Sequence, residues 1–229
     1  MPPFLHDADL QLLHLINRVW THPVLDRLMS TVTDFGAWAP VFAVIAVLAL
    51  LLGGTRGRLL CAAIALGVLL GDGVVSGNLK HWTKRLRPNE SVQEVMVREL
   101  PNLHPRLLGV FQAPLVHPAK LAPPGSKGKS FPSSHVVNMV TLATIALRMF
   151  GWRRAWWVAA LAALVAWSRI YCGAHWPSDV ICAVPLGMLC GWVAFTLVDK
   201  AWRRHGPRFF PKAWRAMPKL RAEKGQGPG

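Results

Sequence analysis

FGAWAPVFAVIAVLALLL, from Phe35 to Leu52, is a stretch of 18 residues without a charged side chain. A helix that crosses the hydrocarbon core of a bilayer needs about 20 predominantly apolar residues, and tilt or polar ends relax that number. The stretch is therefore predicted to be a membrane-spanning helix. The alternative is a buried helix in a large soluble helical core.

Four further apolar runs follow. The run from Leu59 to Leu79 carries one charge, Asp72, and the other three carry none: Val136 to Leu147, Ala155 to Trp167 and Val180 to Val198. Apolar residues make up 52% of the chain and charged residues 16%, a balance typical of membrane proteins. We therefore predict an all-α, multi-pass membrane bundle of about five transmembrane helices. The third and fourth runs are short, so their polar ends are expected at the headgroups.

Asp72 is the exception within these runs. A charge in hydrocarbon is costly and often functional. Because Asp72 lies at least two helical turns from Lys80, we expect a buried, hydrogen-bonded acid that helps the helices pack. Gly67, Gly71 and Gly77 would allow another helix to approach closely.

Residues 1–34 differ from the apolar runs because they are amphipathic. Apolar residues between Leu12 and Val19 fall on one helical face, and polar residues surround the other. Asp7 and Asp9 stand where a secretory signal would be basic. This segment is predicted to be a helix that lies in the membrane interface.

The formal net charge of +15 indicates topology rather than nucleic-acid binding. No motif that reads nucleic acid is present. Short loops beside cytoplasmic helix ends are enriched in lysine and arginine. Arginines follow the first and third runs, and residues 201–229 form a basic tail, so all three regions are predicted to be cytoplasmic. The tail either only anchors this topology or also binds anionic lipid headgroups.

The opposite, external side is also rich in positive charge. Its lysines and arginines are Lys80, Lys84, Arg85, Arg87, Arg98, Arg106, Lys120, Lys127 and Lys129. Because topology disfavours such charge there, an anionic ligand is the predicted reason. Residues 89–131 form a proline-rich loop over the predicted site, which either shapes lipid entry and headgroup recognition or is an inert linker. Its acidic residues are scattered, so we predict no metal site and no cofactor.

Part of this loop, GSKGKS from Gly125 to Ser130, ends like a nucleotide-binding P-loop. The complete pattern needs a glycine five residues before Gly128, and Pro123 stands there. A P-loop is therefore not predicted.

Three polar clusters converge on the external face because of the order of the runs. They lie in GNLKHWTKRLRPN (77–89), FPSSHVVN (131–138) and SRIYCGAHWPSD (168–179). Taken singly, each has a structural explanation as cations at a helix end, helix caps or an exposed turn. Together they predict an anion site.

The phosphate-binding candidates are Lys80, Arg87 and Arg169, with Ser133 and Ser134 at the start of the third run. Cations can neutralise the phosphoryl oxygens whose charge must be stabilised in the transition state. Backbone amides at a helix start add a favourable dipole for an anion.

The catalytic candidates are His175, His135 and Asp179. His175 can attack phosphorus while Asp179, four residues later, accepts its ring N–H. His135 can protonate the departing oxygen and then activate water. The predicted reaction is phosphoryl transfer without a metal.

These segments resemble the signature of the type 2 phosphatidic acid phosphatase superfamily, the lipid phosphate phosphatases, which also includes soluble haloperoxidases. The K-x6-R-P motif corresponds to Lys80 through Pro88, P-S-G-H to Pro132–His135, and S-R-x5-H-x3-D to Ser168–Asp179. The one departure is Ser134, where the family has glycine.

The resemblance implies a phosphohistidine on His175, with His135 as the acid. We thus expect residues 35–200 to form a lipid phosphatase domain in the bacterial inner (plasma) membrane, with its site facing the periplasm or exterior. Its partners are membrane lipids and a lipid phosphate, first undecaprenyl diphosphate, then phosphatidylglycerol phosphate, phosphatidate or lipid A. The alternatives are transfer to a lipid hydroxyl such as that of lipid A, or a vestigial lipid-binding site. A soluble haloperoxidase ranks last, and the oligomeric state is not readable from the sequence.

Overall fold

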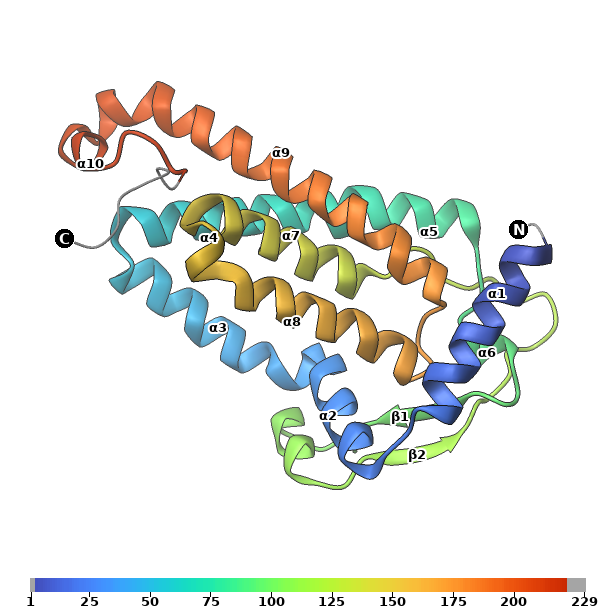
Figure 1. The fold of residues 1–229 in the computed structure, drawn as a ribbon. Helices are drawn as coiled ribbons and strands as arrows, with labels where there is room; N and C mark the ends of the chain where they lie inside the picture. Colours follow the sequence, from blue (N-terminus) through green and yellow to red (C-terminus); the bar gives the residue numbers. More distant parts are fainter. Residues whose placement is uncertain (1–2, 222–229) are drawn as a thin grey trace.

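The apolar runs become long helices that lie alongside one another in the computed structural model of the chain (Figure 1). The structure describes residues 3–221. The long helices are α3 (Phe35–Leu52), α4 (Gly54–Val68), α7 (Ser134–Phe150), α8 (Trp152–Tyr171) and α9 (Pro177–Phe209). α4 continues through a π-helical stretch, Leu69–Ser76, into α5 (Gly77–Thr83).

α7 lies at the centre of the bundle and α3 at its outside. α7 packs against α8, α9 and α4, and buries Val136, Val137 and Ile145. α3 is apolar along its whole length, yet it exposes large side chains such as Leu51 and Leu52. An exposed helix that is apolar on all sides suits a lipid environment.

Three helical stretches are long and apolar enough to cross a membrane by length and composition: α3, the stretch that begins at Gly54, and α9. α7 is a shorter apolar helix. α8 exposes tryptophans near both ends, among them Trp152 and Trp167, which is typical of helices that meet two membrane interfaces. The prediction of an all-α, multi-pass membrane bundle is confirmed.

The expectation for Asp72 is wrong. Gly71 faces α7 so closely that a Cβ atom there would lie 2.9 Å from Val137 Cγ1. The next residue, Asp72, consequently points away from α7 and is exposed. It is not a buried acid at a helix interface.

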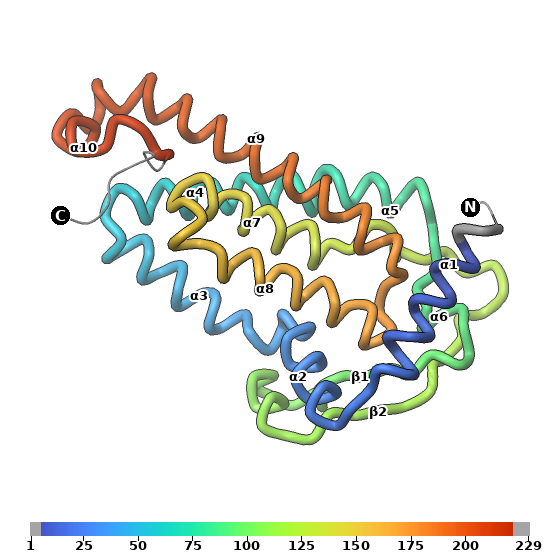
Figure 2. Tube along the Cα trace, in the orientation of Figure 1, coloured from blue at the N-terminus to red at the C-terminus, as the bar shows by residue number. Residues whose placement is uncertain are grey.

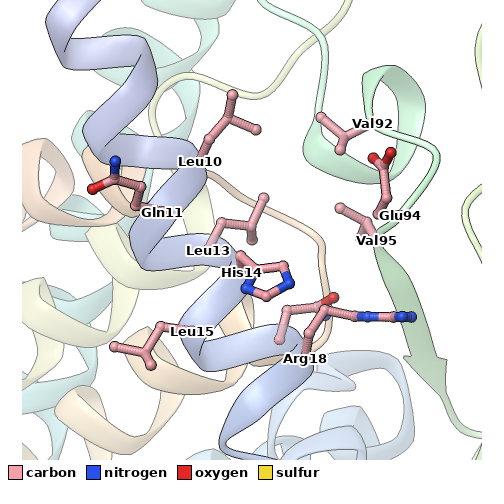
Figure 3. Close-up of a pocket in the computed structure, with 10 residues that line it drawn as sticks. Leu10, Gln11, Leu13, His14, Leu15, Arg18, Val92, Glu94 and Val95 are labelled. Atoms are coloured by element: carbon pink, nitrogen blue, oxygen red, sulfur yellow. The ribbon is translucent and has the colours of Figure 1, made fainter.

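The first 34 residues form α1 (Pro3–His14), a π-helical stretch (Leu15–Val19) and α2 (Pro23–Thr33). Leu13 and Ile16 are buried against the bundle, whereas Leu12 and Val19 are exposed. Figure 3 shows α1 side chains facing Val92 and Val95 across a cavity of about 500 Å³. None of the predicted site residues lines this cavity.

Residues 89–131, called the cap below, cover the end of the bundle near α1 and α2 (Figure 2). The structured parts are α6 (Pro88–Ser91), β1 (Met96–Glu99), a 3-10 helix (Arg106–Phe111) and β2 (Leu115–Pro118). β1 and β2 pair antiparallel, with Met96 opposite Pro118. α10 (Pro211–Ala216) follows α9 at the other end of the bundle.

The cap is tied to the N-terminal segment by specific contacts. The Asn17 side chain donates to the Met96 carbonyl at 2.8 Å and accepts from the Met96 amide at 2.9 Å. Arg98 is buried and forms an ion pair with Asp26 at 2.6 Å. These contacts fix the position of β1 beside the bundle.

Candidate active site

The eight predicted site residues come from five segments at the capped end of the bundle (Figure 1). Lys80 lies on α5, and Arg87 immediately precedes α6. Ser133, Ser134 and His135 lie at the start of α7, and Arg169 lies in the last turn of α8. His175 lies in the turn before α9, and Asp179 is in the first turn of α9.

Arg87, Arg169 and His135 line one polar cavity of about 470 Å³. Residues of the cap and of the α2–α3 junction complete its wall, so the cavity lies between the bundle and the cap. The His135 ring packs against Phe35 of α3, with the ring centroids 4.4 Å apart. The charged residues of the lining are Arg87, Arg98, Arg106, Arg169, Asp34 and Glu99. Arg98 and Arg106 pair with aspartates, so Arg87 and Arg169 are the arginines that suit a small anion.

Arg169 is buried and incompletely paired. Its Nη1 donates to Thr33 Oγ1 at 2.5 Å, whereas its Nε has no hydrogen-bond partner among the described residues. A buried N–H without a partner is costly, especially on a charged group. Arg169 lines the cavity, so an anion bound there would lie beside this guanidinium.

His175 is 2% exposed and lies behind the cavity wall with Asp179. Its Nδ1 is 3.5 Å from Asp179 Oδ2, longer than a hydrogen bond, and has no other partner in the described chain. Such contacts are often long in an enzyme without substrate and tighten when substrate binds. The pKa of His175 is lowered to about 4, mainly by burial and also by the Arg169 charge, while Asp179 opposes the shift. The ring is therefore neutral at pH 7 and available as a nucleophile.

Asp179 is held by several donors. Arg85 Nη1 donates to its Oδ1 at 2.7 Å, and the Trp176 amide donates to its Oδ2 at 3.1 Å. The Ser130 hydroxyl also donates to Oδ2. The carboxylate is thus oriented beside His175 by the chain that surrounds it.

Lys80, Ser133 and Ser134 do not line the cavity with Arg87. Ser133 is buried, its amide lies 3.4 Å from the Asp179 carbonyl, and its hydroxyl has no partner in the described residues. Lys80 Nζ donates to Ser134 Oγ at 2.5 Å. The pKa of His135 is lowered to about 3, mainly by burial and also by the charges of Arg169, His175, Lys80 and Arg87.

A sequence profile of the PAP2 superfamily matches residues 56–203, more than half of the chain. The chain belongs to the PAP2 superfamily. The resemblance found in the sequence is thereby confirmed.

Relatives of this PAP2 protein include lipid phosphatases. A lipid A 4'-phosphatase from Bacteroides thetaiotaomicron is 28% identical over 210 residues, 89% of this chain and 83% of that protein. An undecaprenyl-diphosphatase from Sulfolobus acidocaldarius is 37% identical over 87 residues, 37% of this chain and 39% of that protein. The crystal structure of Aquifex aeolicus LpxE matches with a TM-score of 0.59 at 23% identity, covering 82% of this chain and 94% of that chain. This last likeness shows that the two proteins share a fold.

Two residues that the motifs do not specify, Arg85 and Asp9, also belong to the surroundings of Asp179 in this PAP2 protein. Arg85 Nη2 forms an ion pair with Asp9 at 2.7 Å, while Nη1 holds Asp179. Asp9 is itself buried and accepts from the Ser178 amide at 2.8 Å. Arg85 also lies over the Trp176 ring, 4.9 Å from the ring centroid. Arg85 and Asp9 therefore position Asp179 without lining the cavity.

A sequence signal for this pair exists but is weak. Arg85 is one of the many cations on the predicted external side, and Asp9 is one of the few acids in the first 34 residues. Opposite charges on two segments that reach the same membrane surface are candidates for pairing. The sequence does not indicate which cation meets which acid.

Proposed function

We propose that this PAP2 protein hydrolyses a phosphate ester or diphosphate of a membrane lipid through a phosphohistidine on His175. The observation that carries the proposal is the buried, neutral imidazole beside Asp179, at the same end of the bundle as Arg87, Arg169 and His135. A neutral ring nitrogen has the lone pair that an attack on phosphorus requires.

In the first step, His175 Nε2 attacks phosphorus and the bond between phosphorus and the leaving oxygen breaks. The negative charge of a bound phosphate raises the pKa of His135, so that this ring carries the proton it donates to that oxygen. Asp179 accepts the Nδ1–H of the His175 ring, which becomes positively charged. Lys80, Arg87 and Arg169 neutralise the phosphoryl oxygens. Arg87 and Arg169 line the cavity of His135, whereas Lys80 lines a neighbouring one.

In the second step, His135 takes a proton from water, and the water oxygen attacks the phosphohistidine. The N–P bond breaks, inorganic phosphate leaves and His175 becomes neutral again. Transfer to a lipid hydroxyl would use the same intermediate, with the hydroxyl in place of water. Both reactions use groups at the capped end of the bundle.

For the substrate we propose lipid A phosphate first and undecaprenyl diphosphate, the substrate expected first before the comparisons, second. The relative named for lipid A matches 89% of this chain, so the match extends beyond the three motifs. The relative named for undecaprenyl diphosphate matches 37% of the chain. We place the site on the periplasmic or exterior side of a bacterial inner membrane because of the positive charge after the first, third and fifth apolar runs.

The test is release of inorganic phosphate by purified protein in detergent with EDTA. Substrates are lipid A, undecaprenyl diphosphate, phosphatidylglycerol phosphate and phosphatidate. His175→Ala should lower kcat at least about 10³-fold, whereas His205→Ala, which changes an exposed histidine on α9, should not. Phosphate recovered on an added lipid acceptor would favour transfer. Full turnover by His175→Ala would refute the mechanism.

A further inference from the structure

A second cavity, of about 480 Å³, lies against α5 and is lined by basic side chains. Its basic lining residues are Lys80, His81, Lys84, Lys127 and Lys129. No acidic residue lines it. This cavity is separate from the one lined by Arg87, Arg169 and His135.

The segment that resembles an incomplete P-loop builds one wall of this cavity. The Gly128 amide donates to the Lys84 carbonyl at 3.1 Å, and the Ser130 amide donates to the Arg85 carbonyl at 2.9 Å. A Cβ atom at position 128 would lie 2.2 Å from the Arg85 carbonyl oxygen, so only glycine allows this approach. The close pairing brings Lys127 and Lys129, on either side of Gly128, against the end of α5.

The lysines of this cavity have no carboxylate partners. None of them is in an ion pair within residues 3–221. Lys80 interacts electrostatically with Asp72 and with the cations Arg87, Arg169 and Lys129. Like charges held together repel one another, and an anion with several oxygens would relieve that repulsion.

The position of the cavity indicates the source of such an anion. α5 ends the membrane-crossing stretch that begins at Gly54, at the capped end of the bundle. Trp82, next to His81, is 73% exposed, as expected for a side chain at the level of the lipid headgroups. Phosphate groups of lipids lie at that level.

Lys80 connects this cavity to the proposed reaction. It lines the basic cavity, and its Nζ also donates to Ser134, the neighbour of His135 in the first turn of α7. We propose that the basic cavity binds a second phosphate group beside the one that is hydrolysed. The second phosphate belongs to the same substrate molecule or to an adjacent anionic lipid. The place of this second phosphate beside a hydrolysed one rests on the proposed function, whereas phosphate binding by the cavity does not.

The test uses Lys127→Ala/Lys129→Ala, with Lys120→Ala as a control for an exposed lysine of the cap that does not line the cavity. One arm compares phosphatidate with phosphatidylglycerol phosphate in zwitterionic vesicles, because these lipids carry one and two phosphates on the same diacylglycerol. We expect the ratio of kcat/KM for the second lipid over the first to fall about tenfold in the double variant. The control should leave the ratio unchanged.

The other arm measures phosphatidate turnover as phosphatidylglycerol is added to the vesicles. If the second phosphate comes from a neighbouring lipid, the double variant loses the dependence on phosphatidylglycerol, and the ratio in the first arm stays constant. A change in either arm supports the site and identifies the source. No difference from Lys120→Ala in either arm would overturn the proposal.

Binding separates this proposal from the proposed function. His175→Ala protein is titrated with phosphatidylglycerol phosphate in detergent, and the Lys127→Ala/Lys129→Ala changes are then added. Weaker binding of about tenfold supports the basic cavity even if no lipid releases phosphate from the wild-type protein. Equal binding with normal wild-type turnover leaves the proposed function in place and excludes the same substrate molecule as the source of the second phosphate; together with no effect of added phosphatidylglycerol, it refutes the site.

Discussion

Arg85→Gln tests whether Arg85 positions the catalytic carboxylate. The guanidinium donates at 2.7 Å to both Asp179 and Asp9, which are 0% and 5% exposed. Removing the shared cation leaves two buried carboxylates without a counter-charge, and breaking a buried ion pair in this way costs about 3–5 kcal/mol. Glutamine can return at most one neutral hydrogen bond, which contributes about 1 kcal/mol. We therefore expect the free energy of unfolding in detergent to fall by about 2–4 kcal/mol.

The same substitution should slow the chemical step. Arg85 does not line the cavity, but it holds the carboxylate that lies 3.5 Å from His175 Nδ1. Replacing the carboxylate that orients the histidine of a Ser-His-Asp triad lowers kcat by about 10⁴, and loosening it should cost less. We expect kcat to fall about 10–100-fold with KM changed less than about threefold, measured by phosphate release on the best substrate.

Two further variants make the result interpretable. Asp9→Asn keeps the Arg85–Asp179 ion pair, so kcat should stay within about threefold of wild type, with about 1–2 kcal/mol lost from the free energy of unfolding. Arg85→Lys keeps a positive charge but loses the two guanidinium nitrogens that contact Asp179 and Asp9 at the same time. Its kcat and its free energy of unfolding should lie between those of Arg85→Gln and Asp9→Asn. If Arg85→Gln lowers stability as expected but leaves kcat unchanged, Arg85 has a structural role only and the positioning argument is wrong.

Three more outcomes follow from the site. The pKa of His175 is about 4 in the folded protein and about 6.5 when unfolded, so the unfolded chain binds more protons between these values. The free energy of unfolding should therefore fall by about 3 kcal/mol as the pH drops from about 6.5 to about 4. If His175→Gln loses as much stability as the wild-type protein over this pH range, measured by melting curves, the explanation is wrong. Ser134→Gly should keep the rate of phosphate release within about threefold of wild type, because Ser134 acts only through its contact with Lys80. Lys80→Ala should lower kcat at least about 100-fold, because the proposed role of Lys80 is to neutralise the phosphate. Arg169→Lys should lower kcat/KM at least about tenfold, because lysine has one nitrogen and cannot donate to Thr33 while a second nitrogen donates to the phosphate. Equal kcat/KM values for Arg169→Lys and the wild-type protein would count against phosphate binding by Arg169.

The helices were predictable because lipid imposes a strong local rule. A segment in hydrocarbon must pair all its backbone groups and avoid charge, so an uncharged run becomes a helix with little influence from distant residues. The run from Phe35 to Leu52 coincides with α3 for this reason. The order of the runs was then enough to bring the segments with Lys80, His135 and His175 to one end of the bundle.

Contacts between distant segments were not predictable in the same way. Arg85 and Asp9 are 76 positions apart, and nothing in either local sequence specifies the other. Asp72 shows the related difficulty, because its exposure depends on which helix face meets α7. Its sequence neighbours contain glycines on several faces, and only the packed structure shows that Gly67 and Gly71 meet α7 whereas Gly73 and Gly77 do not. Burial of single residues follows from packing that a hydropathy pattern does not fix.

The excess of cations between Lys80 and Lys129 has two physical explanations. Three arginines pair with aspartates of the first 34 residues: Arg85 with Asp9, Arg98 with Asp26 and Arg106 with Asp34. These pairs neutralise charge within the protein and hold the cap and the N-terminal segment together, so they need no ligand. Five others lie where an anion would meet them, with Arg87 in the cavity of His135 and Lys80, Lys84, Lys127 and Lys129 in the basic cavity. If positive charge in this region served only solubility, it would be spread over the surface. Its division into paired arginines and unpaired lysines around cavities instead favours a ligand with more than one phosphate within reach.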